Sequence, residues 1–172
     1  MKASTVVTRA YSGLDKGTQY VSPGKMPSFD SNTWPLGSVN DCSGFVDWCL
    51  RFSQNRKVDH PLYKKVNGGW FETSAIYEDG LASTGYFSRI DEAIPGAFLV
   101  YPDYVSEDKK HHQGHIGVVI EANGAGPSGV KKIIHCSLSA STNLNDAIQL
   151  TDASIWVNHA KSIIVWFDGM QA

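Results

Sequence analysis

Three residues that could together carry out nucleophilic chemistry lie in separate segments of this chain. Cys42 belongs to a short polar stretch, residues 41–44, while His115 and His135 each stand at one end of a run rich in β-branched residues. A thiol at a helix N-terminus lies in a positive local field, which favours the reactive thiolate. An imidazole can hold the proton of a thiol and later donate it to a leaving amine. These residues therefore predict the parts of a cysteine hydrolase.

Each of the three residues has a catalytic role in this interpretation, and each also has a purely structural alternative. His115 acts as the base, and His135 on a neighbouring strand accepts its N–H and fixes its tautomer. The backbone N–H of Cys42, at the free end of its helix, donates to the developing oxyanion. The alternatives are a cysteine buried in the core and histidines that are only hydrogen-bonded or solvated. Cys49, which lies among apolar residues, is assigned to the core.

Two helices are expected before the histidines. An apolar stripe at helical spacing predicts a helix over residues 43–54, and Asn40 and Asp41 just upstream are good capping residues. A second helix is expected over residues 70–80, closed by Gly80. Sequence upstream of these helices, rich in Gly, Pro, Ser and Asn, predicts loops with a short helix or strand near residues 6–11.

The later part of the chain predicts strands. Residues 86–90 are short and aromatic, Pro95-Gly96 is a turn, residues 106–113 read as a polar loop and residues 123–129 as a glycine-rich turn. The strands of an antiparallel sheet are expected over residues 97–101, 115–121, 130–136 and 162–167. Because helices come first and strands follow, the pattern predicts an α+β fold with segregated layers.

Length and composition limit the number of domains and the classes of partner that are expected. The 172 residues fit one domain, which we divide into an N-terminal wrapping segment, 1–39, and a catalytic domain, 40–172. The formal net charge is -2, and the lysine pairs 64–65, 109–110 and 131–132 are dispersed, so no nucleic-acid partner is expected. No stretch is apolar and long enough to span a bilayer, and the N-terminus does not resemble a cleavable secretion signal.

The spacing of cysteines and histidines predicts neither a set of disulfides nor a metal site. The cysteine count is odd, and Cys42 and Cys49 lie too far apart on one predicted helix to form a bridge. His111 and His112, with Asp108 nearby, offer a metal site as an alternative, but adjacent histidines on a polar loop are more often solvated. We therefore expect neither a metal nor another cofactor.

Four segments, in this order, resemble motifs of the NlpC family of papain-like cell-wall cysteine peptidases. Residues 41–46 are similar to the nucleophile motif, 95–101 to a Pro-Gly-Asp strand, 114–119 to the His-Val-Gly-Ile strand, and 133–135 to the strand that carries the third polar residue. The resemblance implies a papain-like α+β fold, in which N-terminal helices pack on a small antiparallel sheet. It also implies a metal-free triad of the cysteine and two histidines described above.

The same resemblance implies a substrate and further site residues. The expected reaction is hydrolysis of amide bonds in peptidoglycan stem peptides through a thioester intermediate. Tyr20 partly matches a Tyr-X-X-Gly-Gly motif of the family, and we place Tyr20, Asp41 and Ser43 near the substrate or the oxyanion. The Asp of the Pro-Gly-Asp strand is replaced by Ala97, which leaves the nucleophile chemistry intact and bears on the choice of substrate.

Two other classes of function remain open on the sequence. One is an acyl- or peptidyl-transferase that uses the same thioester with an amine or alcohol in place of water. The other is a catalytically silent binding domain of the same fold. The expected partner is a peptidoglycan peptide, and a toxin delivered into rival cells would also need a cognate inhibitor protein. Without a cleavable leader, we expect cytoplasmic synthesis, non-classical export and action on the cell wall.

Overall fold

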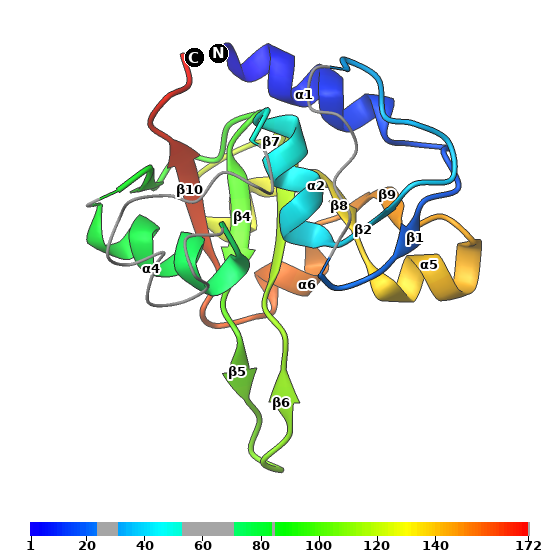
Figure 1. Ribbon diagram of the computed structural model, residues 1–172. Helices are drawn as coiled ribbons and strands as arrows, with labels where there is room; N and C mark the ends of the chain where they lie inside the picture. The colour runs from blue at the N-terminus through cyan, green and yellow to red at the C-terminus, as the bar shows by residue number, and fades with distance from the viewer. Residues whose placement is uncertain (24–30, 53–70, 84, 172) are drawn as a thin grey trace.

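A six-stranded antiparallel sheet forms the centre of the molecule, with helices on both of its faces (Figure 1). The computed structural model describes residues 1–23, 31–52, 71–83 and 85–171. The helices are α1 (Ala3–Ser12), α2 (Cys42–Cys49), α4 (Thr73–Ala82), η1 (Pro127–Gly129), α5 (Leu138–Leu144) and α6 (Ser154–Val157). The strands are β1 (Gln19–Tyr20), β2 (Val39–Asn40), β3 (Phe87–Ile90), β4 (Phe98–Tyr101), β5 (Tyr104–Val105), β6 (His111–His112), β7 (His115–Ala122), β8 (Val130–Cys136), β9 (Ile148–Asp152) and β10 (Ile163–Phe167).

The sheet has the strand order β3-β10-β4-β7-β8-β9, which places β7 and β8 near its centre. Alternate side chains of these strands enter two separate cores. One core includes Val118 and Ile134 and is covered by α1, α2 and α4, while the other includes Val119 and Ile133 and is covered by Trp156 of α6. The expected α+β class and the packing of N-terminal helices on an antiparallel sheet are confirmed.

Helix α2 begins at Cys42, one residue before the predicted start. Asp41 is the N-cap, and its carboxylate accepts from the backbone N–H of Gly44 at 2.8 Å. All eight residues of α2 are buried, so the helix is held by packing on every side. The helix ends at Cys49, earlier than predicted, because Arg51 takes a left-handed conformation with φ 61°. Residues 53 and 54 of the predicted helix lie outside the described residues.

Helix α4 corrects a second prediction. Gly80 does not close the helix but lies inside it, where a Cβ would stand 2.4 Å from a methyl carbon of Val165. The helix therefore continues until Ser83, which adopts the left-handed conformation of a C-cap. Its start is fixed by Glu72, whose carboxylate accepts from two backbone N–H groups of the first turn. Trp70, the predicted first residue, lies outside the described residues.

The segment predicted as a polar loop, residues 106–113, contains a strand of a small hairpin. β5 and β6 pair antiparallel and extend away from the sheet (Figure 1). Stacking of Tyr104 on His112, with ring centroids 4.8 Å apart, stabilises the pairing. Both ends of the hairpin are tied together, because Asp103 accepts from the backbone N–H of Gly114 at 2.6 Å.

The N-terminal segment packs into the same structure as the sheet. Val6 and Ala10 of α1 are fully buried in the core beneath α2. β1 pairs in parallel with β2, which leads directly into α2. The chain before β1 is held by Asp146, whose carboxylate accepts from the backbone N–H groups of residues 16–18 at 2.9–3.1 Å. No helix in the described part of the chain has the length and apolar character needed to cross a membrane.

The Asp146→Ala variant is expected to destabilise the protein by about 2–4 kcal/mol, because several buried backbone donors lose their charged acceptor at once. Urea unfolding, monitored by circular dichroism, measures this loss. Glu78→Ala is the matched control, since Glu78 is exposed on α4. Equal stability of the two variants would contradict the anchoring role of Asp146.

Candidate active site

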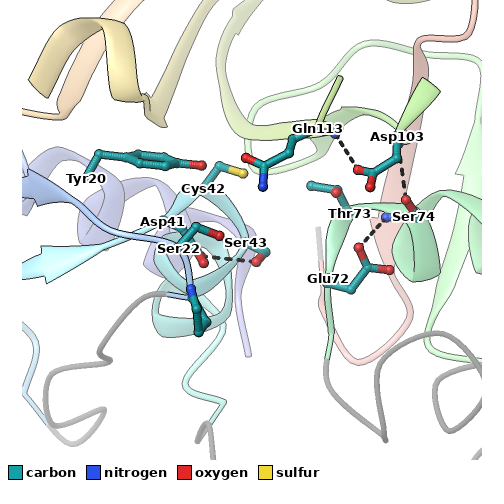
Figure 2. Close-up of a pocket in the computed structure, with 12 residues that line it drawn as sticks. Tyr20, Ser22, Asp41, Cys42, Ser43, Glu72, Thr73, Ser74, Asp103 and Gln113 are labelled. Carbon is teal, nitrogen blue, oxygen red and sulfur yellow. Dashed lines mark hydrogen bonds between the residues drawn. The ribbon is translucent and has the colours of Figure 1, made fainter. Parts of the chain in front are cut away.

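Cys42 is the first residue of α2 and lies on the wall of a cavity. The side chain is only 6% exposed, and its thiol is not part of a disulfide. The cavity has a volume of about 300 Å³. It is lined from one side by residues around β1 and the start of α2, and from the other by the start of α4 and the base of the hairpin (Figure 2). A substrate entering this cavity would meet the sulfur directly.

Tyr20 lies beside Cys42 although the two are far apart in sequence. The β1–β2 register pairs Tyr20 with Asn40, so the tyrosine lies next to the start of α2. Its backbone N–H donates to the Ser141 hydroxyl at 2.9 Å, which holds β1 in place. The phenol points toward the sulfur (Figure 2) and donates a hydrogen bond to it. The structure thus places Tyr20 next to Cys42.

Asp41 and Ser43 also line the cavity, but their polar groups bond to each other. The Ser43 hydroxyl donates to the Asp41 carboxylate at 3.2 Å, and the same carboxylate oxygen caps α2. Across the cavity stand Glu72 and Asp103. Among the lining residues that the structure describes there is no lysine or arginine, so the cavity carries a negative potential.

The protonation of Cys42 differs from the sequence-based expectation. Burial raises the pKa of the Cys42 thiol to about 12, and the negative charge of Asp41 acts in the same direction. Hydrogen bonds from the Ile116 backbone, the Tyr20 hydroxyl and the Ser43 backbone lower this pKa without reversing the shift. The carboxylate that caps α2 also offsets the positive field of the helix end. In the free protein the sulfur is therefore a thiol rather than a thiolate.

His115 and His135 meet across neighbouring strands. The distance between His115 Nε2 and His135 Nδ1 is 2.8 Å, and the rings lie nearly perpendicular. Continuing the β7–β8 register by one residue places Gly117 opposite His135. A Cβ on Gly117 would stand 3.0 Å from the His135 Cβ, so glycine makes room for the contact. The predicted pair of imidazoles is present, and His135 is buried rather than solvated at a sheet edge.

Both imidazoles are held neutral by their surroundings. Burial lowers the pKa of His135 to about 4. The pKa of His115 lies well below its usual value of 6.5, first because of burial and second because of the nearby His135. A neutral imidazole is the form that can accept a proton from a thiol.

Two residues that the sequence did not single out complete the imidazole pair. Thr151 on β9 lies 3.0 Å from His135 Nε2 through its hydroxyl oxygen. Trp156 of α6, fully buried, stacks flat on His115 with ring centroids 5.0 Å apart and contacts His135 edge-on. Neither residue belongs to a recognisable motif. The pairing of β9 with β8 is the feature that brings Thr151 to the site.

The start of β7 links the sulfur to the imidazoles. Cys42 accepts a backbone hydrogen bond from Ile116, the residue that follows His115. Burial raises the pKa of Tyr101 to about 12, with smaller contributions from the negative charges of Tyr104 and Cys42, and Tyr101 pairs with His115 in the β4–β7 register. The β7 backbone next to His115 therefore reaches the sulfur, while the His115 side chain is not among the residues that line the cavity. Cys49 and Cys136 are buried outside the cavity lining.

The other histidines that the structure describes stack on aromatic rings or lie exposed. His112 stacks on Tyr104, His159 stacks on Tyr101, and His111 is exposed on the hairpin 3.6 Å from Asp103. Within the described ranges, no cluster of three or more His, Cys, Asp or Glu side chains has the arrangement of a metal site. His60 lies outside the described residues.

Comparisons with known proteins give no further assignment. No model of a known protein family matches this chain, and no curated protein matches its sequence. The function of the site is therefore argued from its residues.

The pKa of His135 predicts how stability depends on pH. The neutral form is favoured in the folded state, so the unfolded chain binds more protons between pH 6.5 and about 4, and stability falls as pH falls through this range. Between pH 7 and pH 5 we expect His135 to contribute a loss of about 2 kcal/mol. His135→Asn is expected to reduce the pH-dependent loss by this amount in urea unfolding, because asparagine does not titrate. The exposed control His111→Asn keeps the wild-type loss, and an unchanged loss in His135→Asn would show that the imidazole is not held neutral.

Proposed function

We propose that the protein is a cysteine hydrolase that cleaves amide bonds of peptidoglycan stem peptides. The proposal depends above all on the hydrogen-bonded pair His115–His135 at the end of the sheet where Cys42 lines an open cavity. Such a set supplies a nucleophile, a base and a group that orients the base. The resemblance of four sequence segments to the NlpC family supports the choice of substrate.

The first chemical step joins the sulfur to the substrate. As Cys42 Sγ attacks the amide carbonyl carbon, its proton moves to His115 Nδ1 and the carbonyl becomes an oxyanion. Because both groups are neutral at rest, this proton transfer accompanies the attack rather than preceding it. The backbone N–H of Cys42, in the first turn of α2, and the Tyr20 hydroxyl are placed to donate to the oxyanion.

The remaining steps release the products. The tetrahedral intermediate collapses, the C–N bond breaks, and His115 gives its proton to the departing amine. This leaves a thioester on Cys42. Water then attacks the thioester carbonyl while His115 takes one of its protons, the C–S bond breaks, and the sulfur recovers the proton. The net reaction consumes one water and restores the thiol and the neutral imidazole.

The charge of the cavity supports a substrate that carries an amino group. Glu72 and Asp103 line the cavity on the side opposite Cys42 (Figure 2), where their carboxylates also accept from the start of α4 and from the Gly114 backbone N–H. A diamino acid next to the scissile bond of a stem peptide would place an ammonium group in this negative potential. The bond between D-glutamate and the diamino acid is therefore the preferred candidate.

Replacement of Cys42 tests the proposal directly. Cys42→Ala and His115→Ala are each expected to reduce cleavage of purified muropeptides by at least about 10⁴-fold, because they remove the nucleophile and the base. His135→Asn is expected to lose less, since asparagine can still accept from His115. Mass spectrometry of the digests measures the cleavage and identifies the bond.

Cys49→Ala is the control for Cys42→Ala, because it removes a buried thiol at the other end of the same helix. It should keep the wild-type rate, and circular dichroism should show that all four variants are folded. Wild-type activity in Cys42→Ala would contradict the proposed nucleophile. Products joined to an added amine instead of water would identify a transferase.

The pH profile of kcat/KM is expected to have its acid limb below pH 6.5. Protonated His115 cannot accept the proton of the thiol, and burial together with His135 holds the pKa of His115 well below 6.5. Activity should therefore be retained as pH falls through 6.5 and be lost only in more acidic buffer. The limb is measured from initial rates on a soluble muropeptide, and a limb above 6.5 would be inconsistent with a buried, neutral base.

A further inference from the structure

A chain of hydrogen bonds crosses three adjacent strands of the sheet. It runs from His115 on β7 to His135 on β8 and on to Thr151 on β9, with distances of 2.8 and 3.0 Å. A third bond joins the Thr151 hydroxyl to the backbone carbonyl of Asp152 at 2.9 Å. Each neutral imidazole has one N–H and one lone pair, so the direction of this chain decides which nitrogen carries the proton.

The last bond fixes the direction of all the others. A carbonyl oxygen can only accept, so the single hydroxyl proton of Thr151 goes to Asp152. Thr151 must then accept from His135, which places the proton of His135 on Nε2. His135 Nδ1 is left with a lone pair and accepts from His115 Nε2. The proton of His115 therefore occupies Nε2, and its Nδ1 is the free basic nitrogen.

We propose that Thr151 is a positioning residue that sets the tautomers of both imidazoles and thereby keeps His115 Nδ1 available as the base. The assignment of the tautomers is independent of any reaction. The effect on catalysis rests on the hydrolase function proposed above, in which Nδ1 receives the proton of Cys42. Thr151 does not touch the cavity that holds the sulfur, so it acts through the histidines.

The surroundings of Thr151 show why its hydroxyl matters. Thr151 and His135 both line a second hollow of about 590 Å³, between α5, β9 and α6, on the opposite side of His135 from His115. His135 is 2% exposed, so water reaches its Nε2 poorly. Without the hydroxyl, an N–H at Nε2 would be buried without an acceptor, and this cost favours the reversed tautomers. In the reversed chain His135 Nδ1 donates to His115 Nε2, and the proton of His115 lies on Nδ1.

Two variants of Thr151 separate the hydroxyl from the rest of the side chain. Thr151→Val keeps the shape and removes the hydroxyl, while Thr151→Ser keeps the hydroxyl. Thr151 is half-buried on an edge strand, so both substitutions fit the site. Thr142→Val is the matched control, because the Thr142 hydroxyl also donates to a backbone carbonyl but lies on α5, where it is exposed.

Imidazole ¹⁵N shifts from long-range ¹H–¹⁵N spectra at neutral pH report the tautomers without any substrate. We expect the Nε2–H form for His115 and His135 in the wild type, Thr151→Ser and Thr142→Val. In Thr151→Val we expect a measurable population of the Nδ1–H form at both rings. His135→Asn assigns the signals. An Nδ1–H form in the wild type, or identical spectra for the wild type and Thr151→Val, would overturn the proposal.

Kinetics test the consequence of the tautomer for catalysis. Thr151→Val is expected to lower kcat on a muropeptide about tenfold to a hundredfold with little change in KM, and Thr151→Ser is expected to restore it. A loss that serine does not restore would contradict a hydroxyl-specific role. If Cys42→Ala stays active, the proposed function fails, while the ¹⁵N spectra still decide the tautomer. The two failures are therefore distinguishable.

Discussion

The hydrogen bond between His115 and His135, shielded from water, is the interaction on which the rest of the site depends. Its length of 2.8 Å requires that β7 and β8 keep one register and that no side chain stands at position 117. Trp156 covers the pair from the α6 side and excludes water from it. This shielding has an electrostatic consequence, because a charged imidazolium is disfavoured in a site without solvent. The fold therefore holds His115 neutral and fixed in orientation.

The same burial determines the protonation state of Cys42. A helix N-terminus favours a thiolate, but Cys42 is buried and shares that terminus with the carboxylate of Asp41. Burial is the larger effect and raises the pKa of the thiol to about 12. The thiol and the imidazole of His115 are therefore both neutral at rest, so in the proposed mechanism charge develops only as the sulfur attacks. The hydrogen bonds from Tyr20 and the Ile116 backbone stabilise negative charge at the sulfur only when it develops.

Sequence predicted the parts of the structure that depend on local signals. The start of α2 follows from a capping Asp41, and β8 follows from an apolar run that ends at Cys136, with the same bounds in the structure. Predicted helix ends were wrong where tertiary contacts decide them. Gly80, for example, packs against β10 instead of ending α4. The segment 137–157, with α5, β9 and α6, was not predicted at all, because its short elements have no clear periodicity. That segment supplies Thr151 and Trp156, so these two contacts of the histidines were not predicted, whereas Cys42, His115 and His135 were singled out from their sequence motifs.

Several contacts of the candidate site come from the first residues of β7. The backbone of Ile116 donates to the sulfur, the side chain of His115 bonds to His135, and Gly117 leaves room for His135. A slip of one residue against β8 would turn His115 away from Trp156 and His135, toward the core that α2 covers. The irregular register of β7 lies at its far end, between Val119 and Ala122, where a bulge can bend the strand without moving the imidazoles. The regular end of the strand is the end that faces the cavity, so the geometry of the site is set where the sheet is most constrained.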